Sequence, residues 1–190
     1  MNTWTPLADE IHFRPSPNHG YGSARFTPRA ITWHIAEGGL DGTLSWLTSP
    51  ASNASAHLVI ARDGKVFSLV PLREAAWCQG DVCRPNLDQP IVQQTHDAGL
   101  NPNLVSYSIE CIGFSQFGHS GALTAAQAAA LQRVTAYLCW RSGLSADKAH
   151  ILRHSEWNSC TRGGCPGYSA EEYTDWVARV AALTQLWRGW

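Results

Sequence analysis

The chain has 190 residues, of which 44% are hydrophobic and 15% are charged, and its formal net charge at pH 7 is −1. This length is enough for one domain with a sizeable core and is short for two domains. The near-neutral charge offers no basic surface for phosphate groups, so we expect no nucleic-acid partner. No run reaches the roughly 18 apolar residues of a membrane span, so we also expect no membrane insertion.

The N-terminus and the tryptophans add two further expectations. Residues 1–5 lack the basic and apolar segments of a secretory signal, which indicates a chain made in the cytoplasm. Nine tryptophans beside few charges suit the binding of sugars or peptides, although tryptophans also fill the core and its rim.

The six cysteines are too sparse for a disulfide scaffold. Cys78 and Cys83 are near enough in sequence to close a small loop, and two free thiols fit them equally well. Cys111 and Cys139 fall in a predicted strand and a predicted helix, so we expect both to be buried as small hydrophobic residues.

The first part of the chain predicts an irregular arm and then a strand. Residues 1–29 contain several prolines and glycines with little periodicity, and we expect them to pack on the body of the protein. Residues 30–35 alternate, with Trp33 on one face and His34 on the other. A glycine-rich turn and a short helix over 43–47 follow.

The middle of the chain predicts a hairpin, a long loop and a further strand. Two β-prone runs over 56–70 flank an Asp-Gly pair that is typical of a tight turn. Residues 73–105 show no regular pattern, and a loop of this length suits the wall of a binding groove. In the strand over 106–112, Glu110 lies on the face of Ser108, and a glutamate in such a place is costly unless the protein uses it.

The last third predicts two capped helices and one strand. Thr124 with Gln127 forms a capping-box pattern at the start of a helix that ends at Gly143, and Ser169 with Glu172 repeats the pattern before the last helix. A short strand over 149–153 lies between them. The fold class is therefore α/β: a single domain over 30–190 with a central mixed β-sheet flanked by helices, and no linker to a second module.

Three residues from distant segments suggest a metal site. His34 and His154 each stand near the end of a predicted strand, and Cys165 stands in a turn after about ten polar residues. A catalytic zinc ion usually takes three protein ligands and leaves a fourth position open. Each residue alone also fits a structural histidine or a buried thiol, and the intervals match no short-range metal motif.

Five motifs in order resemble the zinc-dependent N-acetylmuramoyl-L-alanine amidases, the family that includes phage lysozyme-type amidases, the muropeptide-recycling amidase and peptidoglycan recognition proteins. The motifs are Thr-Trp-His at 32–34, Ala-His-Leu-Val-Ile-Ala-Arg-Asp-Gly at 56–64, Ser-Ile-Glu at 108–110, His-Ser-Glu-Trp at 154–157 and Cys-Pro-Gly at 165–167. The resemblance covers about residues 30–185 and implies the fold of that family.

The resemblance also implies a reaction and its residues. The reaction is hydrolysis of the amide between N-acetylmuramic acid and L-alanine of peptidoglycan. His34, His154 and Cys165 match the zinc ligands, and Glu110 matches the glutamate that positions or deprotonates the attacking water. Ala56 stands where some relatives have a tyrosine for this task, which leaves it to Glu110.

The chain departs from the family pattern in two places. Gly163 stands where many members have a lysine or threonine that stabilises the oxyanion, and Arg162 is the alternative, either as that group or as a solvated loop cation. Cys78 stands where relatives often have histidine, which we interpret as a change in the groove. Three further residues, His57, Trp77 and Trp157, are expected to contact substrate or to support the metal ligands.

The resemblance leaves alternatives open. A binding-only recognition module is one, although such modules typically lack the cysteine ligand; a cysteine hydrolase that uses Cys165 or Cys160 is another. For the enzyme, we expect a monomeric phage or prophage endolysin that acts on the cell wall without a separate wall-binding domain. A cytosolic amidase that recycles soluble muropeptides is the alternative setting.

Overall fold

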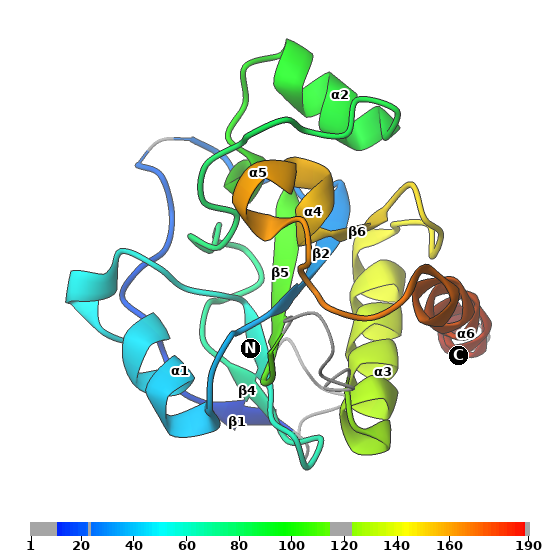
Figure 1. Cartoon of the computed structure of the whole chain (residues 1–190), viewed down its shortest axis with the longest axis horizontal. Coiled ribbons are helices and arrows are strands. Elements are labelled where there is room, and N and C mark those ends of the chain that lie inside the picture. Colours follow the sequence, from blue (N-terminus) through cyan, green and yellow to red (C-terminus); the bar gives the residue numbers. More distant parts are fainter. Residues whose placement is uncertain (1–10, 23, 115–122, 189–190) are drawn as a thin grey trace.

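The computed structural model describes residues 11–22, 24–114 and 123–188, and a six-stranded sheet lies at its centre (Figure 1). The strand order is β1-β4-β3-β5-β2-β6. The bounds are β1 (Ile11–Phe13), β2 (Ala30–Ile35), β3 (Leu58–Ile60), β4 (Val66–Ser68), β5 (Ser106–Cys111) and β6 (Ile151–Arg153). The strands β3, β5, β2 and β6 run parallel, and β4 pairs antiparallel with β3 and parallel with β1. The predicted α/β fold with a mixed sheet is confirmed.

One face of the sheet packs against α3 (Ala125–Ser142) and α6 (Ala170–Arg188), which lie side by side in Figure 1. Trp33 is fully buried in this core, and its Nε1 donates a hydrogen bond to Thr135 Oγ1 on α3 at 3.0 Å. Both predicted capping boxes are present. In each, the cap hydroxyl accepts from the backbone N–H three residues later, and the glutamine or glutamate at that position accepts from the backbone N–H of the cap residue. These caps define where the two long helices begin.

The predicted hairpin is confirmed as β3 and β4. Gly64 adopts φ of 86°, and its N–H donates to Ala61 O at 2.9 Å to close the turn. A Cβ added at Gly64 would lie 2.9 Å from Ala126 O, so both the backbone angle and the approach of α3 require glycine.

The other face of the sheet carries short helices: α1 (Leu40–Leu47), α2 (Pro90–Asp97), α4 (His154–Trp157) and α5 (Ser159–Arg162), with the 3₁₀ turns η2 (Pro50–Ser52) and η3 (Pro102–Leu104). The prediction of irregular chain over 73–105 is wrong for α2 and η3, and the polar loop expected after His154 is wrong for α4 and α5. Helix α2 forms because Pro90 starts it and Ile91, Val92 and Thr95 are buried on one side. Asn158 caps α5 by accepting from Thr161 N at 3.0 Å.

The described part of the N-terminal arm packs on the body and contains a strand where irregular chain was expected. The strand β1 extends the sheet beside β4, and Arg14 N donates to Ser68 O at 3.0 Å. The Asn18 amide donates to Ser49 O at 2.8 Å and Ala54 O at 2.9 Å, which fastens the arm beside α1. Residues 1–10 lie outside the described part.

The disulfide in the structure differs from the Cys78–Cys83 pair considered from the sequence. Cys83 forms a disulfide with Cys160 across 77 residues, and Cys78 is a free thiol. Cys111 and Cys139 are buried and free, as predicted. The disulfide therefore joins the loop before α2 to α5, the helix that leads to Cys165. Among the described helices, none has the length and apolar character needed to cross a membrane.

Candidate metal centre and active site

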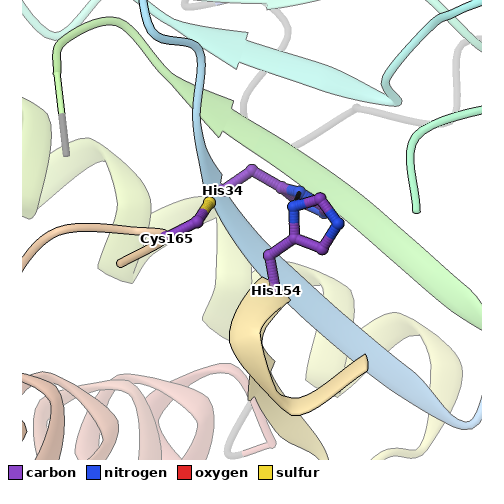
Figure 2. A group of neighbouring side chains, drawn as sticks. All are labelled: His34, His154 and Cys165. Carbon is purple, nitrogen blue, oxygen red and sulfur yellow. Dashed lines mark hydrogen bonds between the residues drawn. The ribbon is translucent and has the colours of Figure 1, made fainter. Parts of the chain in front are cut away.

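The side chains of His34, His154 and Cys165 meet although they come from distant parts of the chain (Figure 2). One nitrogen of each imidazole and the Cys165 sulfur all lie within 4.8 Å of one another. His34 is near the carboxyl end of β2, and His154 directly follows β6, its parallel neighbour. Because parallel strands end at the same edge of a sheet, these two positions bring the rings together.

The two imidazole rings face each other through their Nδ1 atoms, which are 2.9 Å apart. On the other side of the His154 ring, Nε2 donates to Gln79 O at 3.0 Å, which leaves a lone pair on Nδ1. Burial lowers the pKa of His154 to about 4 and that of His34 well below its ordinary value, so both rings are neutral at pH 7. Histidine binds a metal ion through a nitrogen of the neutral imidazole ring.

Cys165 completes the group from a buried turn. Its Sγ accepts a hydrogen bond from Ile35 N at 3.3 Å, and burial raises the pKa of its thiol. A metal ion would replace the thiol proton, since the thiolate is the ligand. Two neutral imidazoles and one sulfur are a donor set that zinc uses in proteins, so the residues fit a zinc ion.

Glu110 provides a carboxyl group beside the three candidate ligands. Its Oε1 is 3.9 Å from His34 Nδ1, and the Cys78 thiol donates to the same oxygen at 3.5 Å. Burial, opposed by the Cys78 hydrogen bond and by the positive charge of Arg162, raises the pKa of Glu110 to about 7. Glu110 Oε2 is buried without a hydrogen-bond partner among the described residues.

An open cavity of about 410 Å³ adjoins this group of side chains. Glu110, His154 and Cys165 form part of its lining, and Arg162, Trp77 and Trp46 form part of the surrounding wall. Trp77 Nε1 is held by Gly20 O at 2.7 Å, whereas Trp46 on α1 is 60% exposed. The cavity lining thus combines the carboxyl groups of Glu37 and Glu110, one arginine and two tryptophans. Trp46 was not identified as a site residue from the sequence. The available signal was its position on the α1 face opposite Leu44 and Leu47, which pack into the core.

Three of the expected site residues, His34, His57 and Trp157, do not line the cavity, and of these only His34 reaches the candidate metal site. His57 is buried with both ring nitrogens bonded to the backbone: Nε2 donates to Glu74 O at 2.9 Å, and Nδ1 accepts from Ser108 N at 3.0 Å. Trp157 is 1% exposed, and its Nε1 donates to Thr32 Oγ1 at 3.0 Å. The structure therefore gives His57 and Trp157 contacts within the protein and does not bring them to the cavity.

The thiols also bear on the cysteine-hydrolase alternative. Cys160 is bonded to Cys83 and offers no free thiol. The buried Cys165 has a raised pKa, which disfavours the thiolate that a cysteine nucleophile needs. In this geometry Cys165 is better suited to hold a metal ion than to attack a carbonyl group.

Fold and cavity together define an α/β protein with a candidate metal site at the carboxyl ends of its parallel strands. The family model for N-acetylmuramoyl-L-alanine amidase matches residues 24–168, so the chain belongs to this family of peptidoglycan amidases.

Relatives in sequence and structure agree with this assignment. The chain is 26% identical over 141 residues to N-acetylmuramoyl-L-alanine amidase A of Achromobacter lyticus, a match that covers 74% of this chain and 67% of that protein. The crystal structure of AmpD aligns with a TM-score of 0.62 at 21% identity over 92% of this chain and 94% of that one. The hydrolase AmiA of Staphylococcus aureus aligns with a TM-score of 0.60 at 14% identity over 95% and 84%. The two structural likenesses show the shared fold.

Proposed function

We propose that the chain hydrolyses the amide between N-acetylmuramic acid and L-alanine with a zinc ion held by His34, His154 and Cys165. The observation that supports this proposal best is the pair of Nδ1 atoms 2.9 Å apart, both on neutral rings, beside a buried sulfur. His154 Nδ1 offers a lone pair, and His34 Nδ1 offers a second one toward the same point when the His34 proton is on Nε2, so that a cation there can bind both nitrogens. When bound there, zinc supplies a Lewis acid for the amide carbonyl and lowers the pKa of a water molecule.

Glu110 is the proposed proton carrier. Its carboxyl group faces the cavity beside His34, and a pKa raised by burial suits a group that takes and returns a proton near neutral pH. Glu110 takes a proton from the attacking water and delivers it to the amine of the departing L-alanine.

Arg162 is the proposed stabiliser of negative charge. It is the last residue of α5 and part of the cavity wall, so its guanidinium can face the oxygen that becomes negative when the amide is attacked. Gly163 has no side chain for this purpose.

Trp46 and Trp77 are the proposed contacts for the sugar and the stem peptide. Aromatic faces bind such ligands by stacking and by apolar contact. An Escherichia coli amidase, AmiD, whose structure contains anhydro-N-acetylmuramic acid-L-Ala-D-gamma-Glu-L-Lys, aligns with a TM-score of 0.57 at 16% identity over 77% of this chain and 58% of that one. A muropeptide of this kind is the ligand that we propose for the cavity.

The proposed setting is that of a monomeric endolysin, made in the cytoplasm and acting on the cell wall. An open cavity with an exposed tryptophan at its wall suits a polymer that extends past the site. The endolysin amidase LysCS of Clostridium intestinale has a related fold, with a TM-score of 0.51 at 16% identity over 83% of this chain and 87% of that one.

The test compares two substrates. Purified protein is incubated with intact sacculi and with soluble anhydromuropeptides, with and without a chelator, and the new termini are identified by mass spectrometry. Our proposal expects new amino-terminal L-alanine from sacculi, with loss of the activity after zinc removal. Faster cleavage of soluble muropeptides than of sacculi would instead favour a recycling amidase. Activity that survives the chelator would contradict the zinc mechanism, and binding without new termini would contradict catalysis.

A further inference from the structure

Two consecutive residues, Cys78 and Gln79, each contact one of the two candidate histidine ligands. The Cys78 sulfur is 3.7 Å from His34 Nε2, and Gln79 O accepts from His154 Nε2 at 3.0 Å. Both contacts are made to the ring nitrogen opposite the Nδ1 atom that faces the candidate metal site. The partner of the second nitrogen fixes the tautomer and the orientation of a metal-binding histidine. The placement of this dipeptide therefore influences both rings together.

The side chain of Asn103 binds both backbone amides of the dipeptide. Its Oδ1 accepts from Cys78 N at 3.0 Å and from Gln79 N at 2.9 Å. Its Nδ2 donates to the hydroxyl of Tyr21 at 2.6 Å, so the amide has distinct partners on its oxygen and nitrogen sides. Asn103 is only 4% exposed, which means that water cannot readily replace these hydrogen bonds.

The surrounding contacts limit how far the effect of Asn103 extends. Its own backbone N–H donates to Asn101 Oδ1 at 2.9 Å, within the first turn of η3. Gln79 has a second anchor, because its Nε2 donates to Ser108 Oγ at 3.1 Å. Loss of the Asn103 oxygen would therefore loosen the dipeptide without detaching it from the sheet.

We propose that Asn103 is a positioning residue for the metal centre: by binding the amides of Cys78 and Gln79, it orients His34 and His154 together. This inference rests on the proposed zinc function. It places no contact between Asn103 and the substrate, so its first effect is on metal affinity.

The experiment measures zinc affinity of the full chain by competition with a chromophoric chelator. Asn103→Leu keeps the approximate size and removes the acceptor, whereas Asn103→Asp keeps an oxygen for both amides, and the Tyr21 hydroxyl can rotate to donate to it. Thr135→Val is the matched control, because it removes a buried hydrogen bond to Trp33 on the other face of the sheet. We expect Asn103→Leu to weaken zinc binding by about 10- to 100-fold, Asn103→Asp to retain most of the affinity, and Thr135→Val to equal the wild type.

A second readout needs no metal. Hydrogen exchange of the Cys78 and Gln79 amides in the zinc-free protein should accelerate in Asn103→Leu and stay slow in Asn103→Asp. If Asn103→Leu does not fold, Tyr21→Phe, which removes the hydroxyl that accepts from Asn103 Nδ2, takes its place with a smaller expected acceleration. The inference would be overturned if Asn103→Leu, or Tyr21→Phe in its place, bound zinc as tightly as the wild type and exchanged the two amides as slowly. A wild-type chain that binds no zinc would instead overturn the proposed function on which the inference rests.

Discussion

His34 on β2 and Glu110 on β5 are register partners in the parallel part of the sheet, and His34 Nδ1 lies 3.9 Å from Glu110 Oε1. Pairing in register places the two side chains on the same face, so a carboxyl group stands beside a candidate metal ligand.

Glu110→Gln should therefore lower kcat on peptidoglycan by about 10²- to 10⁴-fold, because the amide cannot carry the proton. Zinc content should be unchanged, since Glu110 is not one of the three proposed ligands. Steady-state kinetics and metal analysis check this, with the exposed Glu171→Gln on α6 as the control. Full activity in Glu110→Gln would remove Glu110 from the mechanism.

Trp46→Ala should weaken the binding of sacculi. The exposed ring lines the cavity and offers its face to a sugar or peptide, so its removal should cost about 1 to 2 kcal/mol of binding free energy and leave kcat nearly unchanged. Pull-down with insoluble sacculi and measurement of KM test this. The control is Trp140→Ala, because Trp140 is 38% exposed on α3 and is not part of the cavity lining. Equal losses in the two variants would argue against a substrate contact at Trp46.

The local parts of the fold could be predicted from the sequence because their causes lie within a few residues. The Asp-Gly turn, both capping boxes and the alternation around His34 are of this kind. The meeting of His34 and His154 was also predictable in outline, because both were placed at strand ends, where a sheet presents side chains to a shared site.

Other features depend on contacts between distant segments and could not be predicted in this way. Helix α5 has four residues, receives its N-terminal cap from Asn158 and is tied by the disulfide to Cys83, 77 positions away from Cys160. The motif around His57 resembles part of a functional site, yet both ring nitrogens of His57 form hydrogen bonds with the backbone of Glu74 and Ser108. Sequence patterns do not show which backbone N–H and C=O groups lack a backbone partner in the folded chain and so bind a side chain instead.

The double variant Cys83→Ser/Cys160→Ser should be less stable than the wild type. The disulfide closes a loop across 77 residues, and its loss should lower the free energy of unfolding by about 2 to 4 kcal/mol. Urea denaturation measures the difference. A reductant should bring the wild type to the stability of the double variant and leave the variant itself unchanged; a wild type that is insensitive to reduction would show that the bond does not contribute.

Acidification should destabilise the chain partly through His57. Burial lowers the pKa of His57 to about 4 from its ordinary value of 6.5. Between these values the unfolded chain holds a proton at this position that the folded chain does not, so stability falls as the pH falls, by about 1.4 kcal/mol per pH unit for this group. His57→Gln should reduce the slope of unfolding free energy against pH between pH 6.5 and 4 by this amount. An unchanged slope would mean that His57 takes up its proton equally in both states.

The central claim, that His34, His154 and Cys165 jointly hold one metal ion, is tested most directly by cobalt(II) titration of the metal-free protein. A thiolate bound to cobalt produces a charge-transfer absorption that imidazole and carboxylate ligands do not. We predict that the wild type gains this absorption with one equivalent of cobalt, that Cys165→Ser lacks it while remaining folded, and that Cys139→Ser keeps it. A wild type without this band, or a Cys165→Ser variant that retains it, would contradict the account.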